Sequence, residues 1–159
     1  MIRRPGRRTK AGPEHREPQW VSRVIANAMH AEIVRTLGGL HGIRDKGLIE
    51  SALDRPRNQF AHTPTADLAD LAAAYGFGLT KNHGYVDGNE RTAFQVMFVF
   101  LDLNFTLVAP DEAEVVRVML GVADGAITEQ ELAAWIRRVA RPGKPTAPLN
   151  IAERPPAAG

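Results

Sequence analysis

A polar segment that leads directly into a long apolar one, KNHGYVDGNERTAFQVMFVFLDLNF at 81–105, constrains the fold more than any other part of this sequence. From Phe94 to Leu103 nearly every residue is apolar, and Gln95 and Asp102 are the exceptions. A run of this length, rich in Phe, Met and Leu and preceded by turn residues, favours a buried helix over a strand. We therefore expect a central buried helix whose first turn follows directly on a polar loop.

The start of this helix has the properties of an anion site. The first turn of a helix leaves N–H groups unpaired and carries partial positive charge, so phosphate binds there readily. Gly88 permits a positive φ or close approach of an anion, and Asn89 suits the N-cap position. Arg91, one turn in, presents a planar fork to phosphate oxygens.

Two further residues add chemistry to this anion site. Asp87, just before the helix, offers a hard oxygen ligand of the kind that Mg²⁺ takes alongside substrate phosphates. His83 is suited to accept a hydroxyl proton near neutral pH. Each residue alone is equally consistent with an ordinary turn or surface position. Their combination indicates a phosphate-transfer site with a general base.

The segment from His83 to Ala93, HGYVDGNERTA, resembles the signature loop of the Fic/Doc family, H-x-F-x-D-[AG]-N-[KG]-R. The ending Arg-Thr-Ala is more similar to the Doc ("death on curing") branch, because Phe94 stands where Fic proteins often carry a second arginine. Upstream, residues 38–45 and 48–53 also resemble the segment that this branch carries before its motif. The resemblance covers about Val21 to Arg138.

The resemblance implies an all-helical transferase that moves part of a nucleoside triphosphate, ATP, onto a protein hydroxyl in the presence of Mg²⁺. It implies that His83 is the general base and that Asp87 is the metal ligand. The phosphate-binding residues that the motif implies are Gly88, Asn89, Glu90, Arg91 and Thr92. Position adds two weaker candidates for phosphate contacts: Gln95, which shares the helix face of Arg91 at i+4, and Lys81, two residues before the histidine.

Two positions depart from the family pattern. Tyr85 replaces the usual Phe, which is a mild change if the ring is a buried anchor whose hydroxyl finds a partner. Glu90 stands where Doc proteins carry Lys and many Fic AMP-transferases carry Gly, a position that bears on which part of the nucleotide is transferred. A carboxylate about 4 Å from a phosphate repels it by about 4 kcal/mol at an effective dielectric of about 20. Glu90 therefore turns to solvent, joins a cation, or weakens nucleotide binding.

Three functions remain open on this basis. The first is a Doc-like toxin that transfers the γ-phosphate of ATP to a Ser or Thr of a protein target, by resemblance elongation factor Tu, and so blocks translation. The second is a Fic-type AMP-transferase, and the third is a catalytically weak protein-binding module. The resemblance also implies a cognate antitoxin that inhibits in trans, because the inhibitory S/T-x-x-x-E-[GN] helix of some Fic proteins is not found in this sequence. Such a partner requires an exposed apolar groove.

Composition limits the class of protein. A chain of 159 residues suits one domain, and the absence of Cys excludes disulfides and thiol nucleophiles. No apolar run is long enough to span a membrane and no secretory signal is present, so we expect a cytoplasmic protein. Residues 1–18 hold six Lys or Arg against two Glu and form a predicted disordered basic arm, and residues 141–159 form a Pro-rich disordered tail. The body, 19–140, is net acidic, so contact with nucleic acid is expected only through the arm.

The remaining patterns predict an all-α, compact bundle of about six helices with a short flap or extended segment. Helices are expected at 22–36, from Asp45 to 53 with a stop at Pro56, at 67–80, after the site loop to 103, from 111 to 124 and from 128 to 139. Asp111 with Glu114, and Thr128 with Glu131, match capping boxes. An extended piece is expected at 105–108. Residues 55–66 are assigned to the target-binding flap by resemblance, and His30 is expected to be packed or solvent-facing rather than a ligand.

Overall fold

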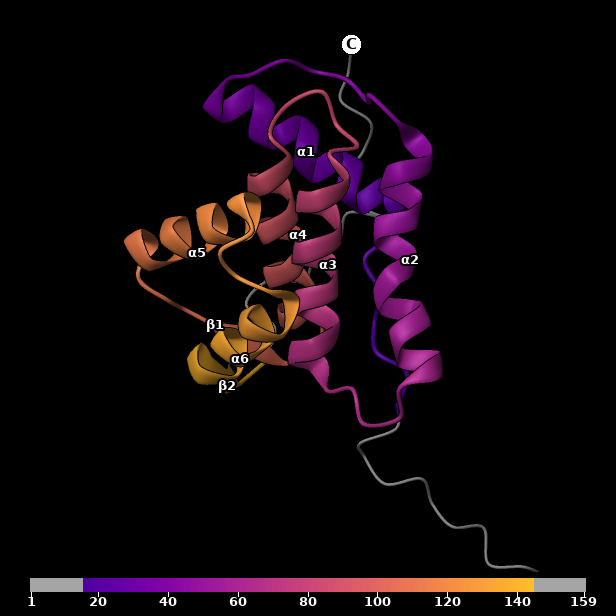
Figure 1. The fold of residues 1–159 in the computed structure, drawn as a ribbon, viewed down its shortest axis with the longest axis vertical. Coiled ribbons are helices and arrows are strands. Elements are labelled where there is room, and N and C mark those ends of the chain that lie inside the picture. Colours follow the sequence, from indigo (N-terminus) through magenta and orange to yellow (C-terminus); the bar gives the residue numbers. More distant parts are fainter. Residues whose placement is uncertain (1–15, 145–159) are drawn as a thin grey trace, which may run out of the picture.

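A computed structural model describes residues 16–144 of the chain. Its helices and two short strands are arranged as an all-α bundle, as predicted (Figure 1). In chain order the elements are α1 (Arg23–Leu37), α2 (Lys46–His62), α3 (Leu68–Asn82), α4 (Asn89–Leu103), β1 (Thr106–Val108), α5 (Glu112–Asp124), α6 (Glu129–Val139) and β2 (Ala140–Pro142).

Helices α3 and α4 lie side by side at the centre of the bundle (Figure 1). The predicted central helix, α4, is confirmed as buried, with Met97, Phe100 and Leu101 fully inaccessible to solvent. Helix α3 is equally central and consists largely of small residues on its buried face, which lets the two backbones approach closely. A Cβ added at Gly76 of α3 would stand 2.8 Å from the sulfur of Met97. This close packing fixes the end of α3 and the start of α4, where the polar loop lies.

Helix α1 crosses the end of the bundle that carries this loop (Figure 1). Its start was predicted correctly: the hydroxyl of Ser22, the N-cap residue, accepts a hydrogen bond from the Ile25 amide at 3.3 Å. The buried face includes Met29, His30 and Val34, whereas Val24, part of the predicted stripe, is 70% exposed. Two polar side chains of α1, those of Asn27 and His30, face the polar loop.

Helix α2 contradicts two sequence predictions. It does not end before Pro56 but runs through that residue to His62, so 55–62 is helical and not an irregular flap. Its buried residues, Ile49, Ala52, Leu53 and Pro56, form one continuous stripe against α3. An interior proline costs a helix about 3 kcal/mol, and burial of the proline ring within this stripe offsets that cost.

The extended segment beside the polar loop is 38–45, which joins α1 to α2. Ile43 and Tyr85 form an isolated antiparallel β-bridge. The amide of Val86 donates to the carbonyl of Gly42 at 3.0 Å, and the amide of Arg44 donates to the carbonyl of Gly84 at 2.9 Å. The backbone that borders the loop therefore comes from a glycine-rich connection upstream of the predicted flap.

The C-terminal elements, from β1 to β2, pack against α3 and α4. The predicted extended piece is confirmed as β1, and it pairs antiparallel with β2, so Arg141 and Pro142 of the predicted tail belong to a strand. The capping box at Thr128 and Glu131 is present. The box at Asp111 is absent: the Asp111 side chain makes no cap hydrogen bond, and Glu114 instead accepts hydrogen bonds from Trp135 and Arg138 of α6.

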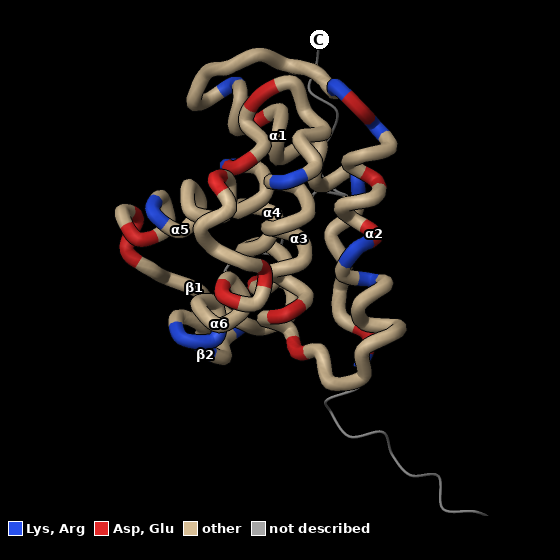
Figure 2. Tube along the Cα trace, viewed as in Figure 1, with Lys and Arg blue, Asp and Glu red and all other residues tan. Residues whose placement is uncertain are grey.

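Charged residues do not form one basic face in the view of Figure 2, where Lys and Arg are interspersed with Asp and Glu over the helices. None of the described helices is both long and apolar enough to cross a membrane. The predicted arm at 1–18 and tail at 141–159 lie for the most part outside the described residues, so their disorder stays a prediction.

Candidate active site

The polar loop runs from the last turn of α3 to the first turn of α4 and is shaped by two left-handed residues. His83 ends α3 with φ 48° and ψ 48°, and Gly88 precedes α4 with φ 70°. The guanidinium of Arg44 donates to the carbonyl oxygens of His83, at 2.8 Å, and Asn82, at 3.2 Å. This arginine satisfies carbonyl groups that the end of α3 leaves unpaired, and it holds His83 in its strained conformation.

The sequence suggested Asn89 as the N-cap of α4, and this prediction is wrong. Gly88 occupies the N-cap position and offers no side-chain cap. The amide of Asn89 is buried and bonds across the loop to the backbone of Tyr85. Its Oδ1 accepts from the Tyr85 N–H at 2.9 Å, and its Nδ2 donates to the Tyr85 carbonyl at 3.0 Å. Asn89 therefore stabilises the loop itself, because it satisfies both backbone groups of a buried residue.

The imidazole of His83 lies beside the first turn of α4. Its Nδ1 is 3.4 Å from Nδ2 of Asn89, and its Nε2 is 3.6 Å from a carboxylate oxygen of Glu90. The side chain of His83 is 57% exposed. Since Nδ1 faces a buried amide, a hydroxyl from solvent can approach the ring only at Nε2. Of the three alternatives open for Glu90, the structure shows the carboxylate next to a group that is cationic when protonated.

The carboxylate of Asp87 is held by backbone amides. Its Oδ2 accepts from the Leu40 N–H at 3.1 Å and its Oδ1 from the Gly88 N–H at 2.9 Å. These two hydrogen bonds, of which that from Leu40 has the larger effect, hold the pKa of Asp87 below its ordinary value. A Cβ at Gly39, which has φ 114°, would stand 2.9 Å from Oδ2, so glycine is required where the 38–45 segment approaches this carboxylate.

The donor set around Asp87 fits a cation that is shared with a substrate. Within residues 16–144 no group of three or more His, Asp or Glu is placed to hold a metal ion. One exposed, ionised and oriented carboxylate is instead the arrangement that suits Mg²⁺ bound jointly by protein, water and phosphate oxygens. Asp87 fits that role, and the remaining ligands would come from the substrate and solvent.

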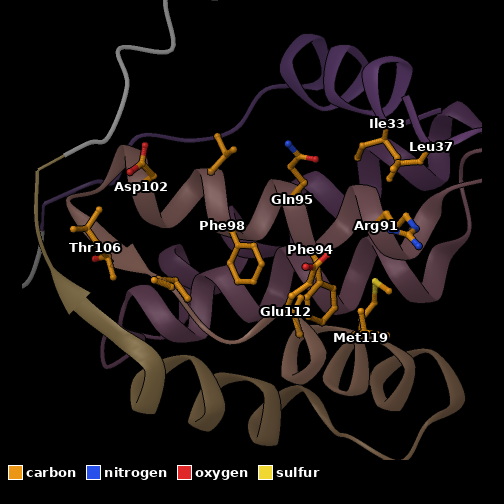
Figure 3. Close-up of a pocket in the computed structure, with 16 residues that line it drawn as sticks. Ile33, Leu37, Arg91, Phe94, Gln95, Phe98, Asp102, Thr106, Glu112 and Met119 are labelled. Atoms are coloured by element: carbon orange, nitrogen blue, oxygen red, sulfur yellow. The ribbon is translucent and has the colours of Figure 1, made fainter. Parts of the chain in front are cut away.

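Arg91 and Gln95 share one face of α4, as their spacing predicted, and this face borders an apolar groove of about 670 Å³ (Figure 3). The guanidinium of Arg91 is exposed and has no partner among the described residues. The groove lies between α1, α4, β1 and α5, and its apolar lining includes Ile33, Leu37, Phe94, Phe98, Val99, Leu107, Val108, Val115, Val116 and Met119.

Two candidate phosphate contacts point elsewhere. The ammonium of Lys81 lies 3.4 Å from the carbonyl oxygen of Ala123, near the end of α5, and above the ring of Phe77. Thr92 is fully buried, and its hydroxyl has no partner among residues 16–144. Neither side chain therefore joins His83 and Asp87 at the surface of the loop in this conformation.

Tyr85 is the buried anchor that its position suggested. Burial raises the pKa of its hydroxyl to about 12, and that hydroxyl donates to Oδ1 of Asn27 at 2.7 Å. Sequence reasoning missed the residues that hold the loop from outside it: Asn27 and His30 on α1, and Arg44. The only available signal was that polar residues stand among the apolar positions of the first helix.

The chain is similar to one family of known proteins and to individual members of it. The model of a family described as "Fic/DOC family" matches residues 20–101. "Protein kinase doc" of Escherichia phage P1 is 30% identical over 112 residues, which cover 70% of this chain and 88% of that protein. "Toxin Doc" of Mycolicibacterium smegmatis is 39% identical over 75 residues, which cover 46% of this chain and 58% of that toxin.

Proposed function

Because the chain belongs to the Fic/Doc family, we propose that it is a Doc-like toxin that transfers the γ-phosphate of ATP to a Ser or Thr hydroxyl of a protein target. One observation carries this proposal above the others. Around the first turn of α4 the loop presents an accessible imidazole nitrogen, an oriented carboxylate and a guanidinium that has no partner within residues 16–144. These are the base, the cation ligand and the phosphate clamp that phosphoryl transfer needs.

In the proposed reaction Nε2 of neutral His83 accepts the proton of the target hydroxyl. The hydroxyl oxygen forms a bond to the γ-phosphorus while the bond from that phosphorus to the β–γ bridging oxygen breaks, and ADP leaves. Arg91 and the free amides of the first turn of α4 hold the phosphate oxygens. Asp87 would hold Mg²⁺, whose contribution is neutralisation of phosphate charge. Most of the rate enhancement then comes from position and electrostatics.

Glu90 carries a charge that opposes this reaction. Its carboxylate stands 3.6 Å from Nε2 of His83, at the place where the target hydroxyl must arrive. A free carboxylate there also repels the triphosphate. We propose that Glu90 moves toward solvent when nucleotide and target bind, which its partly exposed side chain permits.

The groove beside Arg91 is the proposed site of a cognate antitoxin. It is lined by apolar side chains of four elements, as expected for a surface that receives the apolar face of a helix. Arg91 lies at the groove and also one turn into the phosphate site. A helix in the groove would therefore contact the phosphate clamp directly and so inhibit the transfer in trans.

Two parallel reactions with differently labelled ATP test the proposed function. The purified protein is incubated with Mg²⁺ and a candidate target, elongation factor Tu, and with ATP labelled at either the γ- or the α-phosphate. Transfer of the γ label alone supports the phosphotransferase. Transfer of the α label identifies an AMP-transferase instead, and transfer of neither label, together with no nucleotide binding by calorimetry, leaves the binding module.

A further inference from the structure

The imidazole of His30 is a buried polar group that the proposed reaction does not use. It lies on α1, is 4% exposed, and its Nε2 is 2.8 Å from the backbone carbonyl oxygen of Asp87. Because a carbonyl oxygen only accepts, Nε2 must carry the hydrogen in this contact. A residue 57 positions upstream therefore donates a hydrogen bond to the backbone of the proposed cation ligand.

The ring of His30 is also fixed by stacking. It lies parallel to the ring of Tyr85, with centroids 3.9 Å apart and an interplanar angle of 8°. The hydroxyl of Tyr85 donates to Asn27, one turn earlier on α1, and its backbone is bonded to Asn89. Stacking fixes the plane of the imidazole, and in that plane its Nε2–H points at the Asp87 carbonyl.

Opposite sides of Asp87 are held by different parts of the chain. The amides of Leu40 and Gly88 bind the carboxylate, whereas His30 binds the carbonyl behind it. Gly88 lies against α1 as well, since a Cβ added there would meet Val34 at 3.6 Å and His30 at 3.9 Å. Rotation of the peptide between Asp87 and Gly88 would break the His30 hydrogen bond and swing the Gly88 N–H away from Oδ1, so that the carboxylate would lose one of its two amide donors.

We propose that His30 is a positioning residue: its Nε2–H fixes the peptide between Asp87 and Gly88, so that the carboxylate faces the Mg²⁺–triphosphate and the Gly88 turn admits the phosphates. This inference rests on the proposed function for the identity of the ligand. The hydrogen bond itself can be tested without ligand. Hydrogen bonds behind a ligating group commonly change metal affinity by about 10–100-fold.

Two substitutions separate the hydrogen bond from the packing of the ring. His30→Gln keeps an N–H donor at a similar reach and removes the aromatic ring. His30→Phe keeps a ring that can stack on Tyr85 and removes the donor. Met29→Leu, at a neighbouring buried position of α1, is the matched control for a general disturbance of the helix. Thermal denaturation of each variant establishes that it is folded.

The first readout is hydrogen exchange of the Leu40 and Gly88 amides in the protein without nucleotide. We expect protection in the wild type, Met29→Leu and His30→Gln, and a loss of protection of about tenfold or more in His30→Phe. The second readout is affinity for Mg²⁺–ATP by calorimetry, where His30→Phe should bind about 10–100-fold more weakly and His30→Gln within a few-fold of wild type.

The two readouts also separate the inference from the proposed function. Wild-type protein without measurable affinity for Mg²⁺–ATP would contradict the proposed function, and the amide readout would still test the role of His30. Wild-type protection and affinity in His30→Phe would overturn the inference. Equal losses in His30→Gln and His30→Phe would overturn it too, because they would show that the ring acts through packing alone.

Discussion

The loop that carries His83 and the apolar groove beside it adjoin at Arg91 but are built by different forces. The loop is held by hydrogen bonds from single buried or oriented polar groups, such as Asn89 to Tyr85 and His30 to Asp87. The groove is lined by many apolar side chains from four elements. Each of these loop contacts is made by one polar side chain, whereas the apolar contacts of the groove are divided among many side chains. Single substitutions should therefore damage the loop far more than they damage the groove.

Truncation of Asn89 is the most severe test of this difference. Asn89→Ala leaves the buried N–H and carbonyl of Tyr85 unpaired, which should lower the free energy of unfolding by about 2–4 kcal/mol. It should also weaken nucleotide binding, because the start of α4 would shift. Urea denaturation and calorimetry with Mg²⁺–ATP measure the two effects.

Asn82→Ala provides the control for this truncation. The Asn82 side chain donates one hydrogen bond, to the Leu48 carbonyl at 3.0 Å. Its loss should cost about 1 kcal/mol and leave nucleotide affinity near that of wild type. Equal effects of the two truncations would refute the special role of the Asn89 contacts.

In the groove the expected effect is on partner affinity and not on stability. Leu37→Glu introduces a charge at a 59% exposed groove residue and should weaken antitoxin binding about tenfold or more, since the charge loses water in the complex. Val24→Glu adds the same charge to the same helix outside the groove and should bind normally. Titration calorimetry with the antitoxin compares them, and equal affinities would exclude the groove as its site. Phosphate transfer without antitoxin should be unchanged in both variants.

A smaller effect is expected from the charge of Glu90. Glu90→Gln removes the repulsion between this carboxylate and the triphosphate and should raise kcat/KM about 2–5-fold, equivalent to about 0.5–1 kcal/mol for a partly exposed group. Glu50→Gln removes an equally charged side chain that pairs with Arg23 on α1 and should leave kcat/KM unchanged. Slower transfer in Glu90→Gln would mean that the carboxylate assists His83.

The smallest expected effect is on alkaline stability. Burial raises the pKa of both Tyr75 and Tyr85 from 10 to about 12, so the fold favours the neutral phenols. Their contribution to the free energy of unfolding is complete below pH 10 and is lost as the pH rises through 12. Tyr85→Phe should make this loss shallower. Urea denaturation on either side of pH 10 checks it, and an unchanged pH dependence would show that the hydroxyl is not held neutral by the fold.

The contrast between the loop and the groove also explains which features could be predicted from the sequence. The residues from His83 to Arg91 are contiguous, so their motif and the helix that follows were recognisable. The groove was expected only as a consequence of a partner, because its lining comes from segments more than 80 residues apart, from Ile33 to Met119. No local pattern specifies how four such segments converge.

The wrong predictions also involve tertiary contacts. Pro56 was interpreted as a helix stop from its local cost alone, whereas its ring completes the stripe that packs on α3. Asn89 was assigned to the N-cap from residue preference, but its amide is bound by the backbone of Tyr85. His30 was expected to be either packed or solvent-facing; it is buried, and its contact with Asp87 depends on how α1 crosses the loop.

The most direct test of the central claim is phosphate transfer by a variant that lacks only the proposed base. His83→Ala, assayed with γ-labelled ATP and the target, should lose about 10²–10⁴-fold in kcat while it still folds and binds Mg²⁺–ATP. Its exposed ring makes little contribution to the core, so stability should remain near that of wild type. Undiminished transfer by the His83→Ala protein would contradict the assignment of the general base and, with it, the proposed reaction.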